Sequence, residues 1–365
     1  MMKKILFLLA LSILIIGAKN SCSKQEKKQN PSSLFIIKVG DKWGYINNEG
    51  KIMINPQFDE ADEFNDGLAL VRVGDKWGYI NNEGEMIINP QFDEAGYFKD
   101  GLARIKVGRK YGYINKEGEM IINPQFYRAG DFHDGLASVL VGRKWGYINN
   151  KGKMIINPQF YGVEDFNEGL ALVKVGRKWK FINKEGKIVI NTQFDMADDF
   201  NEGLARVLVG GKWGYINKEG KMIINPQFNW AENFNEGLAL VKVGRKEKFI
   251  NKEGKIVINS HFDMAIDFND GLARVLVRGK WGYINKEGEM IINPQFDSAR
   301  DFYEGLARVE VGHKWGYINK KGEMIINPQF DEAEDFNNGL ALVVVGGKYG
   351  YINKEGKYVY ENDIK

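Results

Sequence analysis

Acidic residues cluster in a segment that recurs along the chain, first seen as "DEFNDG" at 62–67. Such carboxylates could bind calcium, which needs oxygen ligands at alternate positions that converge on one point. Phe64 interrupts this alternation, and aspartate in a polar segment before glycine is typical of a solvated turn. The sequence therefore predicts neither a metal site nor a cofactor.

Catalysis would need a nucleophile, a base or a metal gathered in one place. The three histidines, His133, His261 and His313, occupy three different positions of the repeated unit, and none is paired with a fixed serine. Cys22 is the only cysteine, so no intrachain disulfide can form. We therefore expect no catalytic residues and a protein that is not an enzyme.

An aromatic residue recurs in the segment "KWGYI" (42–46) and its copies. Aromatic faces stack on sugars and cations, so this row is the candidate face for a ligand or partner; the alternative is packing between units. One copy has Glu247 instead, and burying an unpaired carboxylate would cost several kcal/mol. The aromatic site should thus have a route to water. The candidate residues are Trp43, Trp77, Tyr111, Trp145, Trp179, Trp213, Trp281, Trp315 and Tyr349.

These aromatic positions are spaced by 34 residues throughout, which defines ten copies of one unit. Three segments per unit have the composition of strands, as at 68–73, 76–81 and 85–89. They are joined by tight turns, one of which ends in a uniform glycine, so each unit is predicted to be a three-stranded antiparallel meander. The connector at 56–67 has apolar residues three apart, which favours a helical turn.

Comparison of the copies indicates the core. Ile46, Phe58 and Phe64 and all their equivalents are invariant, so we assign them to the structural core. Position 70 and position 72 vary freely, as expected for the solvated face of a sheet. Two copies, at 177–191 and 245–259, share lysine for glycine, phenylalanine for tyrosine and a lost proline, which indicates duplication of a 68-residue pair.

The ends of the array bear on its closure. The first unit begins with its own first strand (34–39), and the last (340–365) ends after its third. A closed propeller often splits one blade between its termini, and ten blades would be many for one ring. We therefore expect an all-β, open superhelical or solenoid stack; a β-propeller, or two five-bladed rings, are the alternatives.

The N-terminus resembles an export signal. Lys3 and Lys4 precede an apolar run that is too short to span a bilayer, which predicts a signal peptide over 1–21. Its end resembles a bacterial lipoprotein signal, which implies lipidation of Cys22, a polar tether at 22–33 and, from Ser23, sorting to the outer membrane. An ordinary cleaved signal is the alternative.

The repeat itself, "GKWGYINKEGK" (211–221) with F-x-x-G-L-A at 64–69, resembles the bacterial WG-repeat proteins over 34–365. The resemblance implies a β-repeat protein, often exported, without agreed catalytic residues. A net charge of +3 gives no footprint for nucleic acid. We expect a non-enzymatic envelope lipoprotein that acts as a scaffold for protein–protein interaction; the alternative is binding of cell-wall glycan by the aromatic row.

Overall fold

The computed structural model describes residues 33–259 and 262–362, which belong to one compact unit. The predicted signal peptide, Cys22 and almost all of the predicted tether lie outside the described residues. Within the described residues the regular structure consists of β-strands. No helix in that part of the chain is long and apolar enough to cross a membrane.

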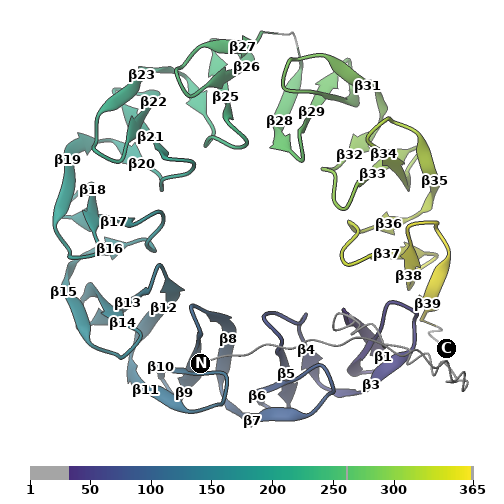
Figure 1. Cartoon of the computed structure of the whole chain (residues 1–365), viewed down its shortest axis with the longest axis horizontal. Helices are drawn as coiled ribbons and strands as arrows, with labels where there is room; N and C mark the ends of the chain where they lie inside the picture. The colour runs from purple at the N-terminus through teal and green to yellow at the C-terminus, as the bar shows by residue number, and fades with distance from the viewer. Residues whose placement is uncertain (1–32, 260–261, 363–365) are drawn as a thin grey trace, which may run out of the picture. The chain divides into compact units, whose positions relative to one another are not determined.

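The strands form ten separate antiparallel sheets that follow one another around a ring (Figure 1). In each sheet the strands are hydrogen-bonded in sequence order, and the chain runs from the inside of the ring to its rim before it enters the next sheet. This is a ten-bladed β-propeller, and the expected open solenoid is wrong. We number the blades 1 to 10 in chain order.

Blades 1 to 5 contain, in that order, β1 (Phe35–Val39), β2 (Lys42–Ile46), β3 (Ile52–Phe58); β4 (Glu60–Ala61), β5 (Ala69–Val73), β6 (Lys76–Ile80), β7 (Met86–Phe92); β8 (Glu94–Lys99), β9 (Leu102–Val107), β10 (Lys110–Ile114), β11 (Met120–Phe126); β12 (Arg128–His133), β13 (Leu136–Val141), β14 (Lys144–Asn149), β15 (Met154–Phe160); β16 (Gly162–Val163), β17 (Leu170–Val175), β18 (Lys178–Asn183), β19 (Ile188–Phe194). Blades 6 to 10 contain β20 (Met196–Ala197), β21 (Leu204–Val209), β22 (Lys212–Asn217), β23 (Met222–Phe228); β24 (Trp230–Ala231), β25 (Leu238–Val243), β26 (Lys246–Asn251), β27 (Ile256–Ile258); β28 (Met264–Asn269), β29 (Leu272–Val277), β30 (Lys280–Ile284), β31 (Met290–Phe296); β32 (Ser298–Ala299), β33 (Leu306–Val311), β34 (Lys314–Asn319), β35 (Met324–Phe330); β36 (Glu332–Ala333), β37 (Leu340–Val345), β38 (Lys348–Asn353), β39 (Tyr358–Glu361).

The connector forms a fourth strand instead of the expected helical turn. In blade 2 it supplies the inner strand β4, in which Ala61 pairs with Val71 of β5. The turn between them places Asp66 at φ 52° and Gly67 at φ 85°. Two successive left-handed residues make the tight hairpin that matches the twist of paired strands. The apolar spacing of three was misleading because its first member, Phe58, ends the outer strand β3 of the preceding blade.

The three predicted strands and the glycine turn are confirmed. In blade 2, Tyr79 of β6 pairs with Leu70 on one side and with Ile88 on the other. Between β6 and β7, the Gly84 amide donates to the Asn81 carbonyl over 2.9 Å, with Gly84 at φ 81°. A side chain other than glycine would be strained at that angle.

The core lies between neighbouring blades. Between blades 2 and 3, the buried ring of Tyr79 packs on Phe98 with 5.1 Å between centroids, and its hydroxyl donates to the Gly96 carbonyl over 2.7 Å. Ile46 and Phe58 are buried in the same way, whereas Phe64 is half-buried. The cluster between blades 2 and 3 also contains Leu70, Ile88, Phe92, Ala103, Ile105 and Ile114.

The ring closes through side chains of blade 10. In blade 2 the Leu70 carbonyl accepts from an inner-strand amide, that of Asp62, over 2.9 Å. Blade 1 has three strands in the described part, and there the equivalent Ile36 carbonyl accepts from the Tyr351 hydroxyl over 2.9 Å. The Tyr349 hydroxyl donates to the Lys38 carbonyl over 2.5 Å and accepts from its amide over 2.7 Å.

Candidate binding site at the blade interfaces

The predicted aromatic row lies on the second long strand of each blade, and every member is half-buried. The tyrosine two residues later is almost fully buried in most blades, although it points to the same face, because the next blade covers it: Tyr45 packs on Phe64 at 5.0 Å between centroids. Cations of the chain already lie over several rings of the row. The Lys38 ammonium is 5.3 Å from the ring centroid of Trp43.

Glu247, which replaces the tryptophan in blade 7, is also half-buried. Its Oε2 accepts a hydrogen bond from the Ala265 amide of blade 8 over 2.7 Å. The half-buried carboxylate therefore has a hydrogen-bond donor in the neighbouring blade, which offsets the cost of its partial burial.

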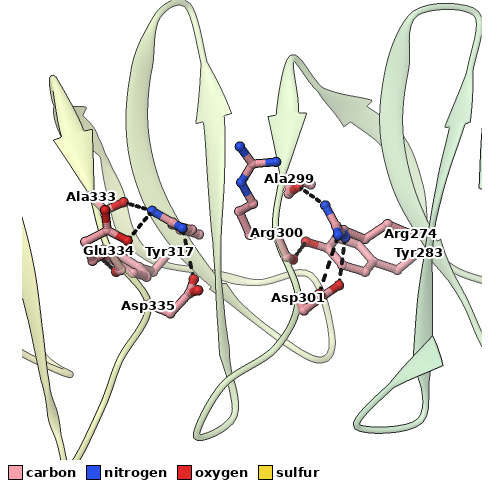
Figure 2. Close-up of polar contacts among 10 residues, drawn as sticks. Arg274, Tyr283, Ala299, Arg300, Asp301, Tyr317, Ala333, Glu334 and Asp335 are labelled. Atoms are coloured by element: carbon pink, nitrogen blue, oxygen red, sulfur yellow. Dashed lines mark hydrogen bonds and ion pairs between the residues drawn. The ribbon is translucent and has the colours of Figure 1, made fainter. Parts of the chain in front are cut away.

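Arginines bridge four of the interfaces close to the inner strands. The Nε of Arg274 in blade 8 lies 2.7 Å from Asp301 Oδ1 of blade 9, and its Nη1 donates to the Ala299 carbonyl over 2.8 Å (Figure 2). Only 12% of the Arg274 side chain is exposed, so the pair is largely desolvated. Equivalent arginines donate to the equivalent alanine carbonyl in the same way, namely Arg104, Arg206 and Arg308.

Each of these guanidinium groups also lies over the aromatic residue of its own blade. The Cζ of Arg206 is 5.1 Å from the Trp213 ring centroid. The same guanidinium bonds to Asp198 of its own blade, and to the carbonyl of Ala231 and the carboxylate of Glu232 in the next. A planar cation between an aromatic face and carboxylates is the arrangement that suits arginine best.

Carboxylates outnumber these arginines around the ring. Two consecutive positions, just before the invariant phenylalanine of each inner segment, carry twelve of them, although the whole chain has a net charge of +3. The inner part of the interfaces is therefore a row of negative charge, which we call the acidic row. It consists of Asp62, Glu63, Asp131, Glu164, Asp165, Asp198, Asp199, Glu232, Asp267, Asp301, Glu334 and Asp335.

Two interfaces that lack the arginine contain carboxylates of the acidic row that resist ionisation. Burial and the carboxylates of Glu164, Asp198 and Asp165 raise the pKa of Asp199 to about 6. Burial and Glu232 do the same to the pKa of Asp267, also to about 6, and its Oδ1 is buried without a hydrogen-bond partner among the described residues. Both groups lie beside blades that carry leucine at the arginine position, namely Leu172 and Leu240.

We predict that Asp267→Asn stabilises the protein at pH 8 and leaves its stability almost unchanged at pH 4. The pKa of Asp267 is raised in the folded state, so its contribution is fully present below the ordinary aspartate range and is lost as pH rises through about 6. Urea unfolding midpoints at the two pH values measure this. Asp301→Asn is the control: Arg274 would lose the carboxylate that neutralises it, so this variant should destabilise the protein at pH 8. A lower midpoint for both variants at pH 8 would contradict the prediction.

An open pocket of about 310 Å³ lies at the interface between blades 5 and 6 and extends to Asn233 of blade 7. Its walls combine an aromatic ring, three carboxylates and an amide, and the lining residues are Glu164, Leu172, Trp179, Ala197, Asp198, Asp199 and Asn233. In the described part of the chain no group of three or more histidine, cysteine or acidic side chains is arranged to hold a metal ion. The chemistry available at these walls is recognition of a cation.

Sequence reasoning did not find this site. It placed position 70 on a freely variable face, whereas the arginines at that position bind the next blade. A signal was present: Arg104, Arg274 and Arg308 are each followed by aspartate 27 residues later. If the connector is taken to be a helical turn, the arginine and the aspartate 27 residues later are not expected to meet at an interface. The spacing was therefore not recognised as an ion pair.

The fold and the site define a repeat β-propeller with charged blade interfaces. The chain belongs to the WG containing repeat family, as the resemblance implied: the family model matches residues 43–77, 77–111, 111–145, 145–179, 181–213, 213–246, 249–281, 281–315 and 315–349. No curated protein matches the chain significantly.

Among solved structures, a eukaryotic initiation factor is similar with a TM-score of 0.51 and 11% identity, over 91% of this chain and 96% of that one. Hsv2 from Kluyveromyces marxianus matches with a TM-score of 0.37 and 11% identity, over 64% of this chain and 95% of that one. The likeness to the initiation factor concerns the fold alone.

Proposed function

We propose that the protein is a non-enzymatic scaffold for protein–protein interaction. The observation that carries this proposal is the acidic row, which the arginines of the chain neutralise only in part. A surface of one charge sign attracts and orients partners of the opposite sign, so the expected partner carries a basic segment. The repeated interfaces hold these charges at fixed places around the ring.

Glycan binding by the aromatic row is less well supported. Stacking on a sugar needs an open aromatic face. Cations of the chain lie over the rings in several blades, as Lys38 does at Trp43 and Arg206 at Trp213. Quenching of tryptophan fluorescence by a panel of cell-wall saccharides would favour the glycan function over the scaffold.

We further propose that the scaffold is exported and anchored in the cell envelope, in the outer membrane, through a lipid on Cys22. The basis is the signal-like segment at 1–21 and the single cysteine that follows it. Changing Cys22 to serine should move the full-length protein from the membrane fraction to the soluble one. An unchanged distribution would disprove the anchor and leave the ring's function untouched.

The scaffold is tested by a pull-down from native envelope extract with the ring as bait. We expect a partner whose capture weakens with salt and is lost when Asp165, Asp199 and Asp267 are all changed to asparagine. The matched control changes Asp59, Asp93 and Asp297, which form exposed ion pairs with lysines, to asparagine and should retain the partner. Capture that is equal for both variants, or no capture, would contradict the proposal.

A further inference from the structure

The pocket beside Leu172 has the walls of an arginine site without the arginine. Arg206 occupies the position equivalent to Leu172, 34 residues later. The groups that hold Arg206 are Asp198, Ala231, Glu232 and Trp213. Moving each by one repeat gives Glu164, Ala197, Asp198 and Trp179, and all four line the pocket.

The repeats therefore act as comparison structures for one another. In four interfaces the equivalent positions surround a guanidinium group, although the carboxylates present differ from one to the next, and the alanine carbonyl accepts from it each time. Asp199, the fifth wall, is the counterpart of Asp301, which binds Arg274 over 2.7 Å. Each wall of the pocket thus has a counterpart elsewhere in this chain that contacts a guanidinium group.

The other interfaces without arginine differ in their walls. Beside Leu240 the aromatic residue is replaced by Glu247, and Ile266 replaces one carboxylate. Beside Leu70 the place of the aspartate is taken by Tyr97. Beside Ser138 the first carboxylate is replaced by Gly130. The interface at Ile36 has four of the walls, Trp43, Ala61, Asp62 and Glu63, but the counterpart of Glu164 lies outside the described residues. Among the interfaces whose two blades both have a described inner strand, the one at Leu172 alone combines the full set of walls with an apolar residue at the arginine position.

The pocket is large enough for a guanidinium group, and its lining is largely polar. Its volume of about 310 Å³ compares with about 30 Å³ for a water molecule, so there is room for a guanidinium group and part of its aliphatic stem. The Oδ1 of Asn233, one of the lining residues, is buried without a hydrogen-bond partner among the described residues. Three carboxylates converge there with Arg206 as their neighbouring cation, since Arg206 bonds to Asp198.

We propose that this pocket binds a guanidinium group supplied from outside the chain, namely an arginine side chain of a partner. The Lys174 ammonium lies 5.8 Å from the Trp179 ring centroid, and a guanidinium group can share the ring with it as Arg104 shares Tyr111 with Lys106. The arginine would stack on Trp179 and donate to the carboxylates of Glu164 and Asp199, as Arg274 does to Asp301. Arginine is preferred over lysine because a planar fork can stack and form paired hydrogen bonds at once, whereas an ammonium cannot. This inference specifies the side chain by which a partner of the proposed scaffold would bind. It depends on the proposed function only for the statement that the arginine belongs to a protein.

The test uses the indole N–H signal of Trp179 in the NMR spectrum of the intact protein, assigned with Trp179→Phe. The probe is N-acetyl-arginine amide, with the isosteric citrulline compound as the uncharged control. We expect a saturable shift of this signal with arginine, a smaller one with N-acetyl-lysine amide, and none with citrulline. The variant Glu164→Gln/Asp199→Asn should bind the arginine probe about tenfold more weakly or worse, because two charge-assisted hydrogen bonds are lost.

Leu172→Arg is the decisive variant, because it fills the pocket from within as Arg206 fills its own site. It should abolish the shift of the Trp179 signal, while Leu240→Arg, placed where the aromatic wall is missing, should leave it unchanged. The unchanged signals of the other indoles show that the variants are folded. The inference is overturned by the absence of a saturable shift up to about 50 mM probe, or by a shift that persists in Leu172→Arg.

Two further measurements distinguish a protein segment from a small molecule as the source of the guanidinium group, and distinguish failure of the pocket proposal from failure of the scaffold proposal. Tighter binding of an arginine-containing tripeptide than of free arginine identifies a protein segment as the ligand; the reverse identifies a small molecule, which overturns the assignment to a partner protein. If the pocket binds arginine but the pull-down captures nothing, the pocket stands and the scaffold fails. If Leu172→Arg retains the captured partner, the scaffold stands and this pocket is not its contact.

Discussion

Replacing Gly214 with lysine should lower the free energy of unfolding by about 1–3 kcal/mol, the usual cost of forcing extra atoms into a packed site. A Cβ atom at Gly214 would lie 2.5 Å from the Ile224 carbonyl oxygen and 2.7 Å from the Pro226 nitrogen. Both neighbours are backbone atoms, so neither can rotate away. Urea unfolding midpoints of the variant and the parent protein measure the effect.

The sequence of the other blades suggests a second substitution that should restore the stability lost in the Gly214 variant. The two blades that have lysine at this glycine, Lys180 and Lys248, have both also lost the proline, which is Thr192 in one and Ser260 in the other; blade 10, with Asn362, lacks it too but keeps the glycine. Lys180 is accommodated with its Nζ 2.6 Å from Asn191 Oδ1. We expect Pro226→Thr to recover most of the stability lost in the Gly214 variant, because threonine leaves the strand free to shift. Strictly additive losses in the double variant would contradict this coupling between glycine and proline.

Removing two hydroxyl groups should weaken the seam between blades 1 and 10. In the double variant Tyr349→Phe/Tyr351→Phe, the Ile36 carbonyl loses the Tyr351 hydroxyl and the Lys38 amide loses the Tyr349 hydroxyl. A buried polar group left without a partner costs about 1–3 kcal/mol, so the seam between blades 1 and 10 becomes the weakest interface. Hydrogen exchange should accelerate in β1 and β38 before it does in the other blades.

The control for the seam is Tyr283→Phe. The Tyr283 hydroxyl donates to the Arg300 carbonyl of the next blade over 2.7 Å, so it also bridges two blades, yet the chain itself has phenylalanine at this position in Phe181 and Phe249. We expect it to have a small and local effect. Uniform acceleration of exchange around the ring in the double variant would show that closure does not depend on the two tyrosines.

The three longer strands of each repeat and its glycine turn could be predicted from the sequence, whereas the inner strand and the closure of the ring could not. Alternating apolar residues and the glycine of the Asn81–Gly84 turn act over short distances, and both predictions hold. The expected open stack rested on the absence of a split blade. In the structure, Tyr349 replaces the tryptophan of most other blades, and its hydroxyl reaches Lys38 at the far end of the chain. No local pattern announces a contact between residues that are more than three hundred positions apart.

The candidate site could be predicted only in part, for a related reason. The aromatic row was placed correctly on its strand, but the fate of each side chain depends on the next blade. Tyr45 is buried because Phe64 covers it, whereas Trp43, on the same face, stays half-exposed. The arginines were missed because a single repeat contains the donor and the following repeat contains the acceptor. Sequence reasoning about one unit therefore describes the sheets and omits the interfaces.

The side-chain seam also bears on how such a protein can change its length over generations. Contacts that close the ring belong to blades 1 and 10 alone, while the interfaces between them share the same buried positions in the repeat. Copies can therefore be gained or lost in the interior of the chain without touching the closure, as the duplicated pair at 177–191 and 245–259 suggests has happened. Each change of copy number must then be absorbed as a small, equal change of angle at all the remaining interfaces. The diameter of the ring thus changes in discrete steps, each set by the number of repeats gained or lost.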